Sequence, residues 1–361
     1  MKIVTVVGAR PQFIKAAALS RALRREHTEV LVHTGQHYDP NMSQVFFDEL
    51  DIPAPDYNLG IAGGSHGQMT GRMLMVLEET LQKERPEMLL LFGDTNSTLA
   101  GALAAVKLRI PVAHVEAGNR TKCLDNPEEV NRVCTDHISA LRFACVESSM
   151  AFLRQEGLES GSYLVGDPMY DAFMYYSARL ERQPIQTLPG FVGKVAIPGR
   201  FYYLTCHREE NTRDEKALEE ILSAMEALDA PVLYPLHPRN RETALALRER
   251  KGLTNTLMVP AVGYLESIFL ISHAQKVITD SGGVQREAFF AQRPCVTVMN
   301  LLAWPETMVG NCNQLAEADR EDILAKLAVT PQRPAGYQPF GDGHAAEKIC
   351  AHLKQWEAEH R

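Results

Sequence analysis

The chain begins Lys2-Ile3-Val4-Thr5-Val6-Val7-Gly8-Ala9-Arg10-Pro11, and this stretch indicates how the rest of the molecule is built. Its β-branched run predicts a buried strand. Pro11 suits the first turn of a helix, where a backbone N–H is not needed. The apolar run is too short for a signal sequence and reaches Gly8-Ala9-Arg10 at once. We therefore expect a strand that passes directly into a helix.

The same alternation of strand and helix continues almost to the end of the chain. Because alternating elements form parallel sheets with helices on both faces, we predict an α/β fold. Strands are predicted at 2–7, 29–34, 88–92, 111–115, 142–146, 201–206, 231–236, 256–260, 276–280 and 294–298, and helices at 11–25, 66–84, 96–108, 214–228, 264–273 and 283–292.

One break in this rhythm predicts two domains. Strand signals disappear between 177 and 200, where prolines and glycines gather as in a linker. We expect an N-terminal domain at 1–176 and a C-terminal domain at 177–342, with a last helix at 343–361 that packs back on the first domain. Two α/β domains of similar size place the main cleft between them, where ligands often bind.

Composition narrows the function classes. The 361 residues carry a net charge of −8, which argues against a general nucleic-acid binder. No apolar run approaches the roughly 18 residues that span a bilayer, so we expect no membrane partner. The seven cysteines are scattered without a CxxC pair, which favours reduced thiols in the cytoplasm and no structural metal.

Four segments with chemically useful side chains lie where a strand gives way to a helix. In an open α/β sheet the carboxyl ends of the strands meet at one crevice, so distant segments can share a ligand. Their residue types favour an anionic, phosphorylated one. The segments are Gly8-Ala9-Arg10-Pro11-Gln12, Gly93-Asp94-Thr95-Asn96-Ser97-Thr98, His114-Val115-Glu116-Ala117-Gly118 and Asp280-Ser281-Gly282-Gly283.

Two of these segments suit phosphate binding. The helix start after Gly8 favours an anion, and Arg10 adds a bidentate donor; the alternative is a tight turn with an exposed arginine. Ser281 and the glycines Gly282 and Gly283 can seat a diphosphate, with Glu287 placed to accept from a ribose diol. The alternative there is an ordinary capped helix with a solvated glutamate.

The remaining candidates are acids and bases. Asp94 and Glu116 end apolar strands, where partial desolvation suits a carboxylate to acid-base chemistry; Asp94 could instead be a plain helix N-cap. Glu128 opens another helix, where acids usually complement the helix dipole. His207 and His237 follow strands of the second half, on the side where the ligand is expected.

Taken together, the segments resemble the non-hydrolysing UDP-N-acetylglucosamine 2-epimerase family across residues 3 to 343. The matching motifs are Gly8-Ala9-Arg10-Pro11-Gln12-Phe13-Ile14-Lys15, Thr34-Gly35-Gln36-His37, Gly93-Asp94-Thr95, His114-Val115-Glu116-Ala117-Gly118, Pro127-Glu128-Glu129-Val130-Asn131-Arg132, Cys206-His207-Arg208-Glu209-Glu210-Asn211, Asp280-Ser281-Gly282-Gly283-Val284-Gln285 and Pro339-Phe340-Gly341-Asp342-Gly343.

The resemblance implies two Rossmann-like domains in the glycosyltransferase-B arrangement, usually as a homodimer. It implies inversion of C2 in a UDP-2-acetamido sugar, UDP-GlcNAc to UDP-ManNAc, by elimination and re-addition of UDP without a metal or nicotinamide cofactor. It also implies three sets of site residues: Asp94, Glu116, Glu128 and His207 for catalysis; Arg10, Ser281, Gly282, Gly283, Glu287 and His237 for UDP; and Lys15, Gln36, His37 and Arg132 as candidates to contact the sugar.

Some features leave the exact activity open. Three segments look most like the branch acting on UDP-2,3-diacetamido-2,3-dideoxyglucuronate, which serves surface polysaccharide synthesis: Asn41-Met42-Ser43, Phe46-Phe47 and His66-Gly67-Gln68-Met69-Thr70-Gly71-Arg72-Met73-Leu74. The Arg-Asp-x-Thr-Glu stretch usual after the strand at 294–298 is absent from residues 299–307. A hydrolysing epimerase, a glycosyltransferase and a non-catalytic UDP-sugar sensor are the alternatives.

Overall fold

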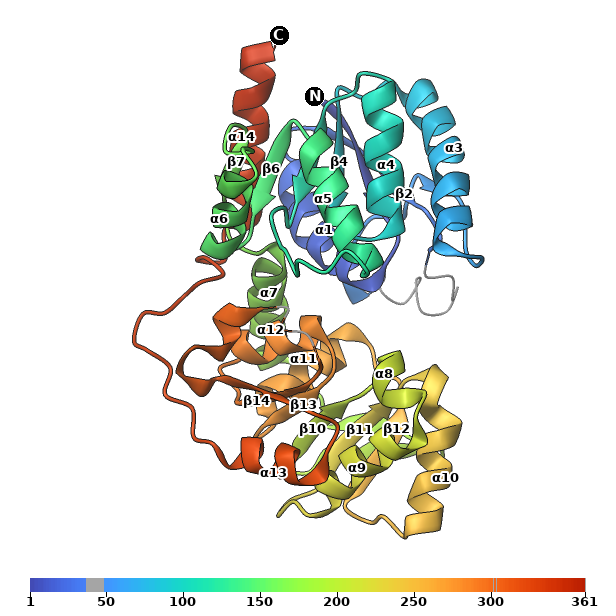
Figure 1. Ribbon diagram of the computed structural model, residues 1–361, viewed down its shortest axis with the longest axis vertical. Helices are drawn as coiled ribbons and strands as arrows, with labels where there is room; N and C mark the ends of the chain where they lie inside the picture. Colours follow the sequence, from blue (N-terminus) through green and yellow to red (C-terminus); the bar gives the residue numbers. More distant parts are fainter. Residues whose placement is uncertain (37–48, 301, 303, 361) are drawn as a thin grey trace. The chain divides into compact units, whose positions relative to one another are not determined.

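The computed structural model describes residues 1–36, 49–300, 302 and 304–360, and the chain divides into two compact units. The N-terminal unit comprises Met1–Met174 and Gln338–Arg361, and the C-terminal unit comprises Tyr175–Tyr337. Each unit is built on a parallel sheet with covering helices (Figure 1). The predicted α/β class with two Rossmann-like parts is confirmed.

The N-terminal unit has a seven-stranded sheet in the order β3-β2-β1-β4-β5-β6-β7, with every pairing parallel. The central strands consist almost wholly of buried apolar residues, as a sheet covered on both faces requires. The strands are β1 (Lys2–Val7), β2 (Thr28–His33), β3 (Tyr57–Asn58), β4 (Met88–Phe92), β5 (Val112–Val115), β6 (Leu141–Ala144) and β7 (Ser162–Leu164).

Two helix layers cover this sheet. Helices α3, α4 and α5 pack side by side over one face, and α1 lies against α14 (Figure 1). Methionine and leucine side chains of α3 and the alanines of α4 form one core with valines and leucines of β1 and β4. The helices are α1 (Arg10–Leu23), α3 (His66–Glu84), α4 (Asn96–Lys107), α5 (Pro127–Ile138), α6 (Glu147–Gln155), α7 (Pro168–Arg182) and α14 (Ala345–His360).

The C-terminal unit repeats the design with six parallel strands in the order β12-β11-β10-β13-β14-β15. Helix α9 packs beside α10 and α13, and α11 contacts α12. The strands are β10 (Tyr202–Thr205), β11 (Val232–Leu236), β12 (Thr256–Pro260), β13 (Val277–Thr279), β14 (Cys295–Val298) and β15 (Asn313–Ala316). The helices are α8 (Glu209–Thr212), α9 (Glu215–Glu226), α10 (Arg241–Lys251), α11 (Tyr264–His273), α12 (Gly282–Phe290) and α13 (Arg320–Ala328), with 3₁₀ helices η1 (Pro238–Asn240) and η2 (Pro305–Asn311).

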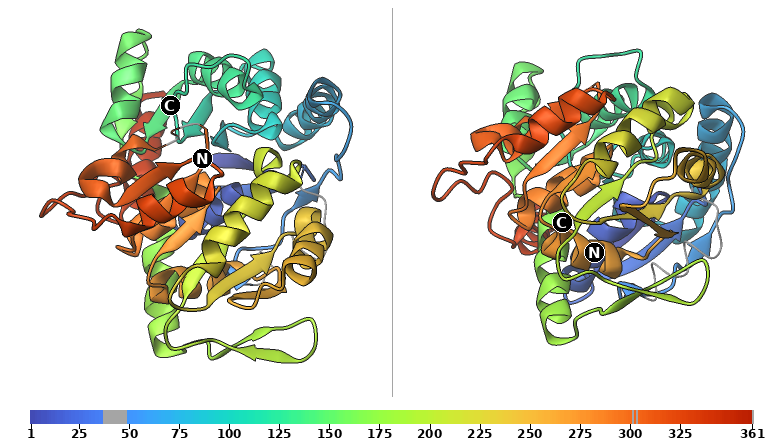
Figure 2. Two further views of the ribbon diagram at one scale, coloured as in Figure 1. Left: turned by 60° about the horizontal axis from the view of Figure 1, so that its bottom comes forward. Right: turned by 90° about the horizontal axis from the view of Figure 1, so that it is seen from below.

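The segment between 177 and 200, where strand signals were expected to be absent, contains regular structure. Helix α7 runs through Arg182, and an antiparallel hairpin of β8 (Thr187–Pro189) and β9 (Lys194–Ala196) follows it (Figure 2). Leu188 is buried in the core of the C-terminal unit, which anchors the hairpin. The turn of this hairpin contains Gly193, which adopts a left-handed φ of +68°.

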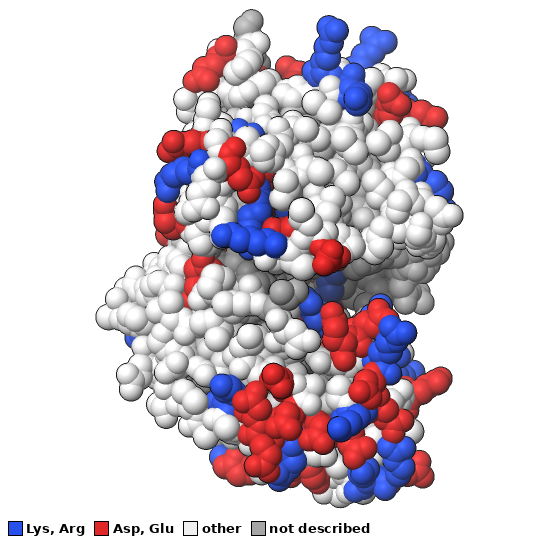
Figure 3. Space-filling view, in the orientation of Figure 1, with Lys and Arg blue, Asp and Glu red and all other residues white. Residues whose placement is uncertain are grey.

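The surface carries mixed charge. Over α9 and α10, acidic and basic side chains alternate on the face shown in Figure 3, and Arg250 and Lys251 of α10 both pair with Glu219 of α9. Within the described ranges, no helix combines the length and apolarity needed to cross a membrane.

Candidate active-site residues in the two units

The topology of each sheet explains where the candidate residues lie. Strand order reverses between β1 and β4 in the N-terminal sheet and between β10 and β13 in the C-terminal sheet. In doubly wound sheets, ligands bind outside the carboxyl ends of the strands at such a reversal. Gly8 and Asp94 follow β1 and β4, while His207 and Asp280 follow β10 and β13. Asp94 and His207 therefore follow strands that flank the switch point of their own sheets.

Asp94 is held at the end of β4 by two residues of α5. Its carboxylate pairs with Arg132 of α5, and its backbone carbonyl accepts a 2.9 Å hydrogen bond from the Asn131 side chain. Burial disfavours the charged guanidinium, yet the carboxylates of Asp94, Glu129 and Glu116 raise the pKa of Arg132 above its usual value. Asp94 is not the helix N-cap, because Thr95 accepts the N–H of Thr98 in that role.

Glu116 ends β5 beside the start of the β4–α4 turn. The β4–β5 register pairs Phe92 with Val115, which brings Gly93 next to Glu116. Glu116 has a left-handed backbone with φ of +70°, a conformation that costs most non-glycine residues about 1 kcal/mol or more. Its buried carboxylate lies 2.5 Å from the ammonium of Lys15, which is itself only 2% exposed. The turn thus directs Glu116 inward to a buried cation on α1.

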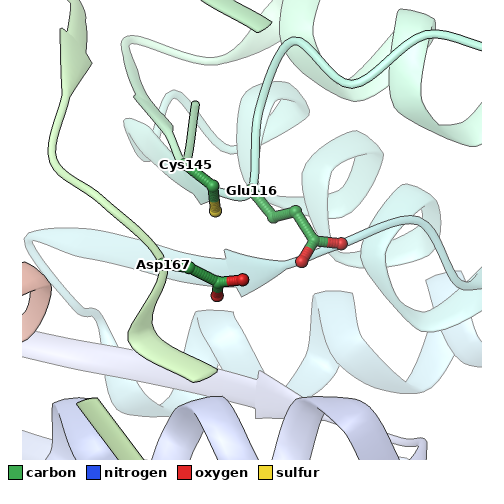
Figure 4. Close-up of side chains that lie close together, drawn as sticks. All are labelled: Glu116, Cys145 and Asp167. Carbon is green, nitrogen blue, oxygen red and sulfur yellow. The ribbon is translucent and has the colours of Figure 1, made fainter. Parts of the chain in front are cut away.

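Glu116 belongs to a buried cluster of three ionisable side chains. Its carboxylate, the Cys145 thiol after β6 and the Asp167 carboxylate before α7 have ligand atoms within 4.8 Å of one another (Figure 4). All three residues are buried. Such a trio has metal-ligand chemistry, but Lys15 already supplies a positive charge to Glu116. Asp167 also accepts the N–H of Met169 at 2.9 Å and so caps the start of α7.

Neighbouring glutamates in α5 have opposite environments. Glu129 is buried and accepts the backbone N–H groups of Thr121 and Lys122, both at 2.9 Å, as well as a 3.0 Å contact from Arg132. Burial alone would raise the pKa of Glu129, but these donors lower it. Glu128 is exposed, and its carboxylate makes no hydrogen bond or ion pair with the described residues. Glu128 is therefore open to a ligand, while Glu129 is committed to the fold.

The turn after β1 uses two of its backbone donors internally. The Gln12 side chain accepts the N–H groups of Gly8 and Ala9 at 2.7 and 3.0 Å, so these donors are already used. The phosphate site expected at this helix start stays a prediction that depends on Arg10, which is partly exposed at the first position of α1. Gln36 accepts from the Ser97 hydroxyl at 2.8 Å. His37 lies outside the described residues.

In the C-terminal unit, His207 faces a buried carboxylate. The β10–β13 register pairs Thr205 with Thr279, which places the next residues of both strands side by side. His207 Nδ1 lies 3.1 Å from Asp280 Oδ1. Burial would raise the pKa of Asp280, but the His207 ring and the backbone N–H groups of His207 and Arg208 lower it. The His237 ring stacks 5.7 Å from that of His207.

The residues after Asp280 form a capped helix start. The Ser281 hydroxyl accepts the N–H of Val284 at 3.4 Å, and Gly282 and Gly283 begin α12 with partial exposure. Glu287 lies further along α12 and is 3% exposed. The segment 299–307, in its described part, packs on this helix through Trp304, whose ring lies 4.0 Å from the Arg286 guanidinium.

Sequence reasoning missed several supporting residues. Asp136 of α5 is the clearest: its carboxylate contacts His114 at 2.7 Å, Arg120 at 2.7 Å and the Gly118 N–H at 2.9 Å. His114 in turn lies 2.6 Å from the Gly93 carbonyl oxygen, so the network holds both turns that carry Asp94 and Glu116. No local motif marks Asp136, because its partners come from separate parts of the chain.

Sequence comparison agrees with this architecture. The profile described as UDP-N-acetylglucosamine 2-epimerase matches residues 21–354. The chain is 45% identical to a UDP-N-acetylglucosamine 2-epimerase homolog of Methanococcus maripaludis over 359 residues, covering 98% of this chain and 99% of that one. It is 44% identical to the UDP-2,3-diacetamido-2,3-dideoxy-D-glucuronate 2-epimerase of Pseudomonas aeruginosa over 364 residues, with the same coverages.

Comparison with solved structures also finds UDP-GlcNAc 2-epimerases. The Methanocaldococcus jannaschii UDP-GlcNAc 2-epimerase, determined with UDP-GlcNAc and UDP, is 34% identical with a TM-score of 0.85 and covers 98% of this chain and 100% of its own. The Neisseria meningitidis UDP-GlcNAc 2-epimerase bound to UDP-GlcNAc is 27% identical with the same TM-score and coverages. The chain therefore belongs to the UDP-N-acetylglucosamine 2-epimerase family of nucleotide-sugar isomerases.

Proposed function

We propose that this protein inverts C2 of a UDP-2-acetamido sugar, UDP-GlcNAc first, by eliminating UDP and adding it back. A carboxylate takes the weakly acidic C2 proton, the bond between C1 and the diphosphate oxygen breaks, and its electron pair leaves with UDP. A proton then returns to the opposite face of C2 as UDP adds to C1. The observation that supports this most strongly is that acid-base residues follow strands that flank the switch point of each sheet, within an epimerase family.

The residue roles follow from their environments. Asp94, Glu116 and Glu128 supply the acid-base groups for the sugar, since each follows or opens an element at the ligand end of the N-terminal sheet. Lys15 and Arg132 hold the first two carboxylates by ion pairs. His207 stabilises charge on the departing diphosphate. Ser281, Gly282, Gly283, Glu287, His237 and Arg10 bind UDP, and Gln36 and His37 are further sugar-contact candidates.

Nuclear magnetic resonance in D₂O tests the reaction directly. UDP-GlcNAc incubated with the protein should yield the C2 epimer as an intact UDP-sugar, with solvent deuterium at C2 of both epimers. Free UDP and free sugar as the sole products would show a hydrolase instead. An unchanged spectrum with no deuterium incorporation would support a sensor and contradict an enzyme.

A second substrate has a specific observation in its favour. In sequence alignments over nearly the whole chain, identity is 44% to the Pseudomonas diacetamido-glucuronate epimerase and 36%, over 359 residues, to the UDP-GlcNAc epimerase of Methanocaldococcus jannaschii; the structural alignment above gives 34% for the latter. The diacetamido-uronate analogue, which would link the protein to surface polysaccharide synthesis, should therefore be compared in the same D₂O experiment. The substrate with the higher kcat/KM identifies the branch.

We infer two further properties from the family resemblance and the cysteines. A homodimer is expected, which light scattering after size exclusion would test. All seven cysteines are free thiols, five of them buried, which supports a reducing cytoplasm. Fractionation of cells expressing the native protein would test that location.

A further inference from the structure

The orientation of His207 depends on one buried acid. Asp280 is 1% exposed, whereas the His207 side chain is 41% exposed. Asp280 Oδ2 accepts the backbone N–H groups of His207 and Arg208, both at 2.8 Å, and the Asn211 amide at 3.3 Å. These three donors occupy Oδ2, whereas the buried Oδ1 has no hydrogen bond within the described residues and lies 3.1 Å from His207 Nδ1.

This arrangement decides which ring nitrogen carries the proton. A carboxylate only accepts hydrogen bonds, so the buried Oδ1 can gain a partner from the neighbouring His207 ring only if Nδ1 carries the proton. The tautomer of a histidine is set by the hydrogen bond that its other nitrogen makes. We propose that Asp280 is a positioning residue that fixes neutral His207 as the Nδ1–H tautomer and leaves Nε2 as the only ring atom that gains or loses a proton.

The proposal rests on the proposed function and deepens it. When the C1–O bond breaks, negative charge develops on the diphosphate oxygen, and protonated His207 donates a hydrogen bond to it from Nε2–H. When UDP adds back, the same hydrogen bond is released. Because Nδ1–H stays on Asp280 throughout, the ring keeps one orientation in both directions. Ser281 directly follows Asp280, so the same turn holds the acid that orients His207 and the proposed nucleotide seat.

Replacing Asp280 by asparagine should reverse the tautomer without dismantling the turn. The backbone N–H groups of His207 and Arg208 need an acceptor, so the amide oxygen of the new side chain should take the place of Oδ2. Its NH₂ group then faces Nδ1 and donates to it, which forces neutral His207 into the Nε2–H form. An asparagine therefore keeps the loop bonded but places the ring proton on the wrong nitrogen.

Nitrogen-15 NMR of the free protein, labelled at its histidines, tests this. The chain has 12 histidines, and the His207 signals are those that vanish in His207→Gln. We expect neutral His207 to show protonated Nδ1 and bare Nε2 in the native protein, and the reverse in Asp280→Asn, with kcat for epimerisation lowered about 10²-fold. The matched control is Asp214→Asn, an exposed helix N-cap in the same unit that should change neither.

The outcomes separate this inference from the proposed function. A native His207 in the Nε2–H form, or the same tautomer before and after Asp280→Asn, would overturn the role of Asp280. If Asp280→Asn does not fold, the spectrum of the native protein decides alone. Normal turnover in His207→Gln would instead contradict the proposed function, since the spectra are recorded without substrate.

Discussion

The Lys15 ammonium lies 2.5 Å from the Glu116 carboxylate, and both side chains are almost fully buried. Such a pair contributes little net stability when complete, because desolvation of the two ions opposes their attraction. Loss of one partner is costly, however, because the other charge remains buried. The Glu116 carboxylate can therefore stay buried in its inward orientation only while the Lys15 ammonium is present.

Lys15→Met should lower the free energy of unfolding by about 3 to 5 kcal/mol, since it leaves the Glu116 carboxylate buried without its cation. Urea denaturation measures this. The double variant Lys15→Met/Glu116→Gln removes both charges and should recover much of the loss. Arg154→Met breaks an exposed pair with Glu147 and is the control, with a cost of about 1 kcal/mol or less. Equal urea midpoints for Lys15→Met and the native protein would show that the pair is unimportant.

Asp94→Asn and Glu116→Gln should each lower kcat for epimerisation by about 10²- to 10⁴-fold, because an amide cannot take up the C2 proton. The measurement is the rate of deuterium entry at C2. Glu147→Gln, an exposed glutamate in the same unit, is the control. Near-normal turnover in both active-site variants would remove these carboxylates from the mechanism.

The adjacent residues Glu128 and Glu129 should separate activity from stability. Glu128→Gln should lower turnover and leave the urea midpoint unchanged, since the exposed Glu128 carboxylate has no partner among the described residues. Glu129→Gln should destabilise the fold by about 1 to 3 kcal/mol, because the donors of Thr121, Lys122 and Arg132 lose a buried, charged acceptor. Lost stability in Glu128→Gln together with lost turnover alone in Glu129→Gln would contradict the roles given to these two residues.

Asp171 of α7 should make stability depend on pH. Burial raises the pKa of Asp171 to about 6, against the 2.7 Å hydrogen bond from the Ala346 N–H at the start of α14. Because the folded state binds the proton more tightly, its contribution is fully present below about pH 4 and is lost as the pH rises through 6. Urea unfolding at pH 4 and 7 measures the change.

In Asp171→Asn the titrating group is gone, so this fall in stability between pH 4 and 7 should shrink. Asp125→Asn, at an exposed position, should leave the profile as it is in the native protein. A native profile in Asp171→Asn would mean that another group titrates.

Much of the fold could be predicted because its strands are strongly apolar. The expected strands at 2–7 and 88–92 match β1 and β4, and the expected helix at 66–84 matches α3. The two-residue strand β3 and the polar Asn313-Gln314 start of β15 escaped notice, since their pairing comes from neighbouring strands and not from local pattern. No strand was predicted for the hairpin of β8 and β9, because turn residues dominate its sequence.

Only those site residues that directly follow a recognisable strand could be predicted from the sequence. Asp94, Glu116 and His207 could be found because each follows an apolar run. The Lys15 contact could not, because it depends on the left-handed backbone at Glu116. Asp167 lies in one cluster with Glu116 although it comes 51 residues later in the chain. The order of the strands in the sheet brings the two residues together. Side-chain partnership of this kind is a property of the packed structure.

The return of the chain to the N-terminal unit has a consequence for biosynthesis. Helix α14 buries Ile349 and Leu353 in a unit whose first segment stops at Met174, within α7. Domains usually fold as units while the ribosome is still at work. Here the first unit lacks its last helix until the entire second unit has been translated, so the half that is made first should be the half that is completed last.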